Sequence, residues 1–537
     1  MPTIRRAAIA LALTAALTGL AGCGSSDDEK KTTATQTPIP RTTPDAPTKT
    51  ETTAETPKVE RFRGIAYPNV DIANTRSTDG PITRKTVEKL EEAWSLPLTA
   101  KSAYGSYSSS PVVADGVVYS QDLVSDVQAI DLKTGEVLWS KEYASPDQGP
   151  NGLVVADGRV FGATATSAFA LDQKTGEELW SKELIRNSGE GIDMSPGYHD
   201  GLVYVSTVPG NNTKFYGGGG VGVLWALDAK TGKRKWTFNT VPKNLWKDSD
   251  FNSGGGLWHA PSFDKDDNMY FGVGNPAPFP GTESDPWGSS RPGKNLYTNS
   301  LVKLDAKTGK LRWYYQLTPH DLYDWDLQDP PILTTVNGRE AVVTAGKGGI
   351  VIAVDRQSGE LLWKRSVGKH NGHDKDGLLA MKGDYDKFEL PMEVYPGTLG
   401  GVIAPMSTDG KTLFVPVVNN SITFASQTQS QPSPDMTGEL DAIDIDTGKI
   451  KWKRKFDSAA FGATSVVNDL VFTATFDGVV HAFDTDTGKQ AWEQDLPSGI
   501  NTGVTIHDDT VLAPAGIAVA QGQAPALVAY RLGGKGK

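Results

Sequence analysis

The feature that most constrains the fold is a short motif that recurs seven times along the chain. Each copy reads Asp-x-x-Thr/Ser-Gly, follows an apolar run, and places a Trp four residues after the Gly. In a turn of this kind the Asp side chain accepts hydrogen bonds from backbone amides, and Gly adopts a positive φ. We therefore expect each copy to join two antiparallel strands. The copies begin at Asp131, Asp172, Asp228, Asp305, Asp355, Asp444 and Asp484.

The spacing of the copies predicts a propeller. Successive copies lie between 40 and 89 residues apart, and the shortest interval leaves room for two further strands, such as a hairpin that turns at Asp115-Gly116. Four antiparallel strands in roughly 40 residues are typical of a propeller blade, and longer intervals indicate blades with insertions. One Trp in every repeat is typical of packing between neighbouring blades, and we prefer that interpretation to a row of ligand-stacking rings.

The two ends of the chain predict one more blade. Trp94 ends a strand that no Asp turn precedes, and residues 526–532 resemble the strand before such a turn but lack the Trp. Joining these strands closes the ring and leaves no open sheet edge. We therefore predict an all-β, eight-bladed β-propeller of four-stranded antiparallel blades, closed by strands from both termini.

The N-terminus predicts export. Basic residues precede the apolar run 7–20, and Leu20-Ala-Gly-Cys23 follows it, which resembles the lipobox of bacterial lipoproteins. The resemblance implies a signal peptide over 1–22 and a lipid on Cys23 that attaches the protein to the cell membrane, outside the cytoplasm. An ordinary signal peptide is the alternative. Residues 23–58, rich in Thr and Pro, are expected to form a disordered tether, and 59–537 to form the propeller.

Composition excludes several classes of protein. Cys23 is the only cysteine, so we expect no structural disulfide, no Cys/His zinc site and no covalently attached haem. The formal net charge of −11 disfavours a nucleic-acid partner, since phosphates would be repelled. His370 and His373 have metal-like spacing but no third ligand nearby, and we do not assign them a metal.

Hairpin geometry brings four unusual residues together. In a blade the first two strands are antiparallel, so the residue before the first strand and the residue after the second lie at the same end. Asp324 precedes a strand expected over 331–336, and Lys347 follows its partner strand. Trp258 and Asn275 occupy the corresponding places in the preceding blade. We therefore expect all four side chains to converge near the ring axis.

The residue types predict a reaction. Carboxylate and amide oxygens suit Ca²⁺ or a similar hard cation. An Asp beside such a cation abstracts a proton while the metal polarises the acceptor. A Lys across the site stabilises a developing oxyanion, and a Trp face is a platform for a flat ring.

Three segments around these residues resemble a known family. Gly254-Gly-Gly-Leu-Trp258, Gly274-Asn-Pro-Ala-Pro-Phe279 and Thr318-Pro-His-Asp-Leu-Tyr-Asp324 are similar to segments of the pyrroloquinoline quinone (PQQ) dependent alcohol dehydrogenases. The resemblance implies that Asp324 is the catalytic base and that Lys347 is the cation beside the quinone.

The same resemblance implies a cofactor and a metal. Trp258 would form the floor under PQQ, and Asn275 and Asp324 would bind Ca²⁺ or a lanthanide ion. Asp326 lies two residues after the base, the spacing of an additional metal ligand in the lanthanide-dependent branch.

The chain also departs from the family pattern. The glutamate that binds the metal is missing, because the expected position reads Ser206-Thr-Val-Pro-Gly210. An arginine that holds the quinone is replaced near Asn151, and the pair of adjacent cysteines is absent. Val402 and Ile403 stand where the family often has Asn and Trp. We expect Asn151 and Asp193 to provide polar contacts to the quinone instead.

Two functions follow from this sequence. The first is an exported quinoprotein that oxidises a small alcohol or other hydroxyl compound and passes the electrons to a separate acceptor. The second is a non-catalytic propeller, a cell-envelope scaffold or binding protein similar to the outer-membrane assembly propellers.

Overall fold

The computed structural model describes residues 66–209, 220–242 and 251–534. The expected signal peptide, Cys23 and the tether lie outside the described residues. In the described ranges no helix is both long and apolar enough to cross a bilayer.

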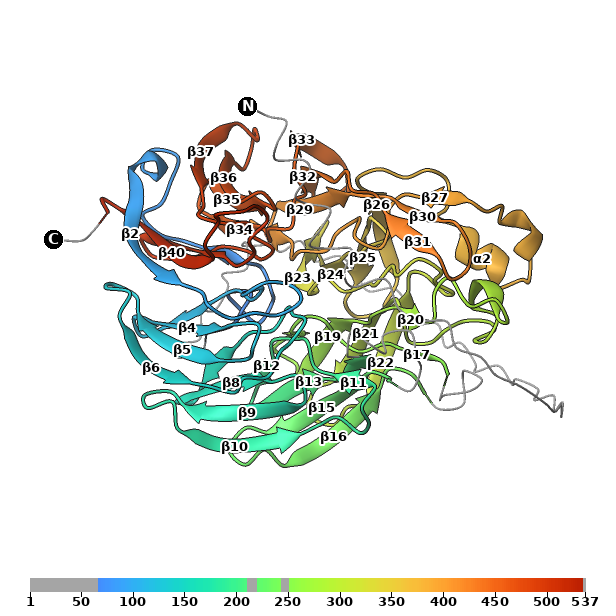
Figure 1. Ribbon diagram of the computed structural model, residues 1–537, viewed down its shortest axis with the longest axis horizontal. Helices are drawn as coiled ribbons and strands as arrows, with labels where there is room; N and C mark the ends of the chain where they lie inside the picture. Colours follow the sequence, from blue (N-terminus) through green and yellow to red (C-terminus); the bar gives the residue numbers. More distant parts are fainter. Residues whose placement is uncertain (1–65, 210–219, 243–250, 535–537) are drawn as a thin grey trace, which may run out of the picture.

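Eight sheets stand side by side around a common axis, seven of them four-stranded and antiparallel and one with a fifth, parallel strand added, which confirms the predicted propeller (Figure 1). Because each sheet buries one face against each neighbour, most inner strands are apolar on both faces. The first seven strand sets are β3–β6 (Val112–Ala114, Val117–Gln121, Val127–Asp131, Val137–Lys141), β7–β10 (Val154–Ala156, Arg159–Ala163, Ser167–Asp172, Glu178–Glu183), β12, β13, β15 and β16 (Gly197–His199, Leu202–Ser206, Val223–Asp228, Arg234–Asn239), β18, β19, β21 and β22 (Ser262–Phe263, Asn268–Gly272, Ser300–Asp305, Leu311–Gln316), β23–β26 (Ile332–Val336, Arg339–Thr344, Ile350–Asp355, Leu361–Ser366), β28, β29, β32 and β33 (Ser407–Thr408, Thr412–Asn419, Thr437–Asp444, Ile450–Phe456), and β34–β37 (Ser465–Val467, Leu470–Thr475, Val479–Asp484, Gln490–Asp495).

The eighth sheet closes the ring with strands from both parts of the chain. β38 (Thr505–His507), β39 (Thr510–Ala515) and β40 (Ala526–Leu532) come from the C-terminal end, and β2 (Leu90–Pro97) pairs antiparallel with β40. Figure 1 shows the blue β2 beside the red β40. Closure from both ends therefore occurs as the sequence predicts.

The repeated Trp and Gly residues hold neighbouring blades together. Trp363 packs on the turn of the next blade, where a Cβ built on Gly448 would lie 2.8 Å from the indole Cδ2, and its Nε1 donates to the carbonyl of Ile445 at 2.9 Å. Gly is required at this position because the backbone has a positive φ and because the indole fills the space of a side chain. The interpretation of these Trp residues as packing between blades is confirmed. The pairs are Trp94–Gly135, Trp139–Gly176, Trp180–Gly232, Trp236–Gly309, Trp313–Gly359, Trp363–Gly448 and Trp452–Gly488.

A segment near the start of the described chain crosses the ring from blade to blade. Between residues 66 and 78 its backbone bonds in turn to β7, β18, β23, β28 and β34, and β1 (Ser77–Thr78) adds a parallel strand to β34. The fully buried Arg76 donates to the carbonyls of Thr464 and Val504. Pro68 and Asn69 of this segment contribute to the wall of the central cavity described below.

Insertions support one part of the ring. The small sheet of β27 (Met392–Val394), β30 (Ile422–Phe424) and β31 (Ser430–Pro432), with the short helix α2 (Asp376–Ala380), packs around Leu322, Tyr323 and Trp325. The Tyr323 hydroxyl donates to Asp376 at 2.6 Å. Residues 322–325, which include Asp324, are thus held by an apolar cluster that the insertions form.

Candidate active site

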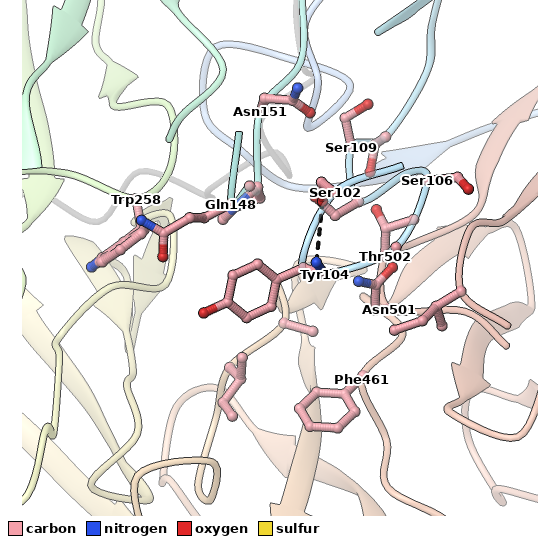
Figure 2. A pocket seen from close by; sticks show the side chains of 18 of the residues that line it. Ser102, Tyr104, Ser106, Ser109, Gln148, Asn151, Trp258, Phe461, Asn501 and Thr502 are labelled. Carbon is pink, nitrogen blue, oxygen red and sulfur yellow. Dashed lines mark hydrogen bonds between the residues drawn. The ribbon is translucent and has the colours of Figure 1, made fainter. Parts of the chain in front are cut away.

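A cavity of about 1090 Å³ lies at the centre of the ring. It is lined by loops from all eight blades, and by residues 98–106, which follow β2. Trp258, Asp324 and Lys347 line it, as the hairpin geometry predicts, but Asn275, the fourth residue expected there, does not. Asn151, expected from the family resemblance, also lines it. Figure 2 shows Trp258 and Asn151 on one side of this space, with Tyr104 reaching into it.

Lys347 joins two carboxylates. Its Nζ lies 2.8 Å from Asp324 Oδ2 and 2.7 Å from Asp326 Oδ2. Asp324 precedes β23 and Lys347 follows β24, so the antiparallel pairing of these strands brings the two residues to one end of the blade. Asp324 has a φ of 63°, a conformation that Asp and Asn adopt more readily than other side chains. The three charges sum to −1 at the edge of the cavity.

Asp326 anchors the neighbouring blade. Its Oδ1 accepts the backbone N–H of Asn275 at 2.6 Å and the indole N–H of Trp258 at 3.3 Å. The carboxylate is fully buried and does not line the cavity. Asp326 thus fixes the relative positions of Trp258, Asn275 and Lys347.

Burial governs the charge states of the pair. It raises the pKa of the Asp324 carboxyl well above its usual range, and the Lys347 ammonium opposes that rise. Burial also disfavours the ammonium of Lys347, but the charges of Asp324 and Asp326 outweigh it and raise the pKa of Lys347. Lys347 is therefore a cation at neutral pH. One oxygen of Asp324, Oδ1, is buried and has no hydrogen-bond partner among the described residues.

The rest of the Thr318–Leu327 stretch is structural. The Asp321 carboxylate accepts the backbone N–H groups of Tyr323 and Trp325. The ring nitrogens of His320 lie 2.9 and 3.1 Å from the carbonyl oxygens of Gly293 and Trp287. Neither Asp321 nor His320 lines the cavity. Both shape the loop that presents Asp324.

The two polar contacts expected for the quinone have different surroundings. Asn151 lines the cavity, its Nδ2 donates to the Asp122 carbonyl at 2.7 Å, and its Oδ1 is buried without a partner among the described residues. Asp193 does not line the cavity, and the expectation that it contacts the quinone is wrong for this conformation. Asp193 is fully buried beside Asp147, which together with burial raises the pKa of Asp193 well above its usual range. Its Oδ1 also lies 3.4 Å from the backbone N of Gln148, a residue that lines the cavity.

Of the three expected metal ligands, only Asp324 lines the cavity; Asn275 does not, and its Nδ2 donates to the Pro276 carbonyl at 3.0 Å. Both Asp326 oxygens are occupied, by Lys347 on one side and by Trp258 and Asn275 on the other. At the position of the missing glutamate, the Ser206 hydroxyl donates to the Thr207 carbonyl. Within the described ranges no group of three His, Cys, Asp or Glu residues is close enough to hold a metal. The free Oδ1 of Asp324 and the net charge of −1 remain available to a positive ion.

The cavity fits a flat cofactor. Its volume exceeds the range of about 300–1,000 Å³ typical of pockets for drug-sized ligands. Trp258 is only partly buried and lines the cavity, and Lys347 and Asn151 supply a cation and a free acceptor beside it.

Several lining residues were missed by the sequence reasoning. Tyr104 and Gln148 belong to loops outside the hairpin ends that we considered. Phe461, Phe476 and Ile517 come from the last two blades, outside the three segments that resemble the family. One sequence feature could have pointed to this part of the cavity: Val402 and Ile403 stand where the family often has Asn and Trp, and Ile403 lines the cavity as well. His370 and His373 form ion pairs with Asp374 and Asp376 at 2.8 and 2.7 Å.

Two family models match parts of the chain. Residues 75–154 and 187–369 match the model of the glucose/ethanol/alcohol dehydrogenase β-propeller domain. Residues 125–248 and 393–535 match the model of the outer membrane protein assembly factor BamB.

Among curated proteins, the chain is similar to a quinohemoprotein alcohol dehydrogenase of Comamonas testosteroni, at 29% identity over 65% of this chain and 54% of that protein. It is also 29% identical to the putative dehydrogenase XoxF of Paracoccus denitrificans, over 82% of this chain and 84% of that protein. The chain thus spans about half the length of the first relative. The haem in the first name belongs to that protein, and the expectation of no covalent haem in this chain rests on its single cysteine.

Solved structures agree on the fold. The crystal structure of the Comamonas testosteroni quinohemoprotein alcohol dehydrogenase aligns with a TM-score of 0.75 and 25% identity, over 88% of this chain and 81% of that one. A europium-containing methanol dehydrogenase aligns with a TM-score of 0.74 and 21% identity, over 88% and 99% of the two chains. The predicted resemblance is confirmed: in sequence and in fold the chain is similar to the PQQ-dependent alcohol dehydrogenases.

Proposed function

We propose that this protein is an exported quinoprotein, anchored to the cell membrane by a lipid on Cys23, that oxidises the hydroxyl group of an alcohol and passes the electrons to a separate acceptor. The observation that carries the proposal is the arrangement of Asp324, Lys347 and Trp258 at one wall of the central cavity. A scaffold needs a folded ring, but it has no need of a buried ion pair beside an exposed indole face.

In this proposal PQQ supplies the two-electron oxidation when it is bound. Trp258 would lie under its ring, and Lys347 and Asn151 would contact its oxygens. Asp324 and Asn275 would hold a Ca²⁺ or lanthanide ion.

Asp324 would take the hydroxyl proton of the substrate. Asp324 lines the cavity, its buried Oδ1 has no hydrogen-bond partner among the described residues, and Lys347 holds Oδ2 and fixes the plane of the carboxylate. Because burial raises the pKa of Asp324, the deprotonated carboxylate is a stronger base than an exposed Asp. The Lys347 ammonium opposes this rise in the pKa of Asp324.

A non-catalytic envelope propeller is the second candidate. It is supported by the match of residues 393–535 to the BamB model and by the hydroxyl groups of Ser206 and Thr207 in place of the glutamate.

The deciding experiment measures PQQ binding and alcohol oxidation with the full-length protein. PQQ is titrated with Ca²⁺, La³⁺ or EDTA while tryptophan fluorescence is followed, and a Trp258→Phe variant identifies the quenching that comes from this site. Dye-linked oxidation is then measured for the protein as isolated and for Asp324→Asn.

The matched control is Asp508→Asn, because Asp508 also has a positive φ but its side chain is 82% exposed and remote from the cavity. We expect Asp324→Asn to bind PQQ and to lose at least 100-fold in kcat, since general base catalysis contributes about 10²–10⁴-fold. Absence of saturable PQQ binding under all three conditions would reject the enzyme and favour the scaffold.

A further inference from the structure

The cavity has two chemically different halves. Its charged and hydrogen-bonding side, with Trp258, Asp324 and Lys347, comes from the blades of β18–β22 and β23–β26. The next three blades of the ring, those of β28–β33, β34–β37 and β38–β40, contribute Ile403, Phe461, Phe476 and Ile517, which we call the apolar wall. Figure 2 shows Phe461 away from Trp258, with Tyr104 between them.

The apolar wall is part of a packed cluster. The Phe461 and Phe476 rings meet edge to face with centroids 5.2 Å apart, and Val418, Ala459 and Val519 lie behind them. Ile403 and Ile517 pack against this cluster and remain partly exposed to the cavity. The wall is therefore a preformed surface, because its side chains are held by the core and not by a loose loop.

Charge is absent from this side. The charged side chains that line the cavity in the described ranges are Asp324 and Lys347, in the charged half, and Lys101, which is exposed. The same three blades also bring Thr398, Asn501 and Thr502 to the cavity. A sugar or glycerol on this side could hydrogen-bond to these three side chains, but the hydroxyl groups packed on the apolar wall itself would have no partners. Methanol or ethanol at Asp324 would leave most of the wall in contact with water. A hydrocarbon chain or ring that extends from the reacting carbon would cover it.

We propose that the alcohol is amphiphilic, with its hydroxyl at Asp324 and a hydrocarbon body of several carbons packed on the apolar wall. The inference rests on the proposed function for the reaction, but the binding of the hydrocarbon body requires no quinone. The volume of about 1090 Å³ leaves space for such a body beside a flat cofactor. Because burial of each methylene is favourable, kcat/KM should rise about fourfold per added carbon until the wall is covered.

The first test uses full-length protein without quinone. Calorimetric titration with 1-octanol and with glycerol compares an amphiphilic alcohol with a polar one. We expect saturable binding of 1-octanol with a negative heat-capacity change, and no detectable binding of glycerol. Ile517→Asn should weaken octanol binding at least fivefold, whereas Leu138→Asn, at an exposed outer-strand position, should not change it. Ile403→Asn provides a second wall variant if Ile517→Asn does not fold.

The second test measures kcat/KM of the PQQ-loaded protein for primary alcohols from ethanol to 1-octanol. We expect the wall variants to lose at least tenfold more activity on octanol than on ethanol. Equal kcat/KM along the series, or a preference for glycerol, would overturn the inference while leaving the proposed function in place. Octanol binding that depends on Ile517, in a protein that oxidises no alcohol, would support the apolar binding wall and reject the dehydrogenase.

Discussion

Replacing Lys347 by methionine tests whether the charges of the site are balanced as the structure indicates. Methionine keeps the unbranched apolar part of the side chain and removes the ammonium. The variant would leave Asp324 and Asp326, both buried, without the cation that now lies 2.8 and 2.7 Å from their Oδ2 atoms. The prediction concerns stability alone and holds with or without a bound quinone.

The expected loss follows from burial. Removing one partner of a buried ion pair costs about 3–5 kcal/mol. The side chains of Lys347 and Asp324 are 14% and 11% exposed, so water reaches the pair from the cavity and the lower end of that range applies. We therefore expect Lys347→Met to reduce the free energy of unfolding by about 3 kcal/mol at pH 8.

The loss of unfolding free energy in Lys347→Met should be larger at high pH than at low pH. Without the ammonium, burial raises the pKa of Asp324 further above its value in the unfolded chain. A raised carboxyl pKa stabilises the folded state at low pH, and this contribution disappears as the pH rises through the raised pKa. At pH 5 the variant should regain part of the loss, about 1.4 kcal/mol for each unit by which the pKa of Asp324 in the variant exceeds its pKa in the wild type.

Urea unfolding of the wild type and the variant at pH 5 and pH 8 measures both effects. Lys364→Met is the control, because Lys364 is exposed on the same blade, and its effect should stay within about 0.5 kcal/mol. A Lys347→Met protein as stable as the wild type at pH 8, or one with the same deficit at both pH values, would refute the reasoning.

Two further predictions concern the ring and its insertion. Gly448→Ala and Gly338→Ala both place a side chain at a positive φ, but only at Gly448 would that side chain meet an indole, that of Trp363. Gly448→Ala should therefore lower the free energy of unfolding, measured in urea, by about 1–3 kcal/mol more than Gly338→Ala. Equal losses of stability in the two variants would exclude the proposed contact between blades. His373 has a raised pKa because it pairs with Asp376, so its contribution is present below about pH 6.5 and is lost as the pH rises through the raised value. His373→Ala should accordingly lower the melting temperature at pH 5.5 more than at pH 8.5, and a loss independent of pH would contradict the ion pair.

The repeat alone determined the fold of this chain. The motif with Asp, Gly and Trp encodes a turn, a strand direction and a contact with the next blade, all within nine residues. Local antiparallel pairing also sufficed to bring Asp324 and Lys347 together, because strands β23 and β24 are joined by a tight turn at Asn337-Gly338. Closure by β2 and β40 could be predicted because each end of the chain carries only part of the repeat, and the two parts together make one blade.

Tertiary structure decided what surrounds those residues. The sequence predicts that Asp326 is a metal ligand, but its Oδ1 accepts hydrogen bonds from Trp258 and Asn275 of the neighbouring blade and its Oδ2 pairs with Lys347. Neither hairpin sequence by itself indicates how closely the two blades approach. Asp193 occupies an equivalent hairpin end but pairs with Asp147, behind the cavity, since loop packing sets which side chain faces inward. The apolar wall likewise arises where loops of three blades meet. Short-range pattern determines strands and turns, whereas a central cavity is shaped by residues distant in sequence, whose contacts depend on how the blades pack.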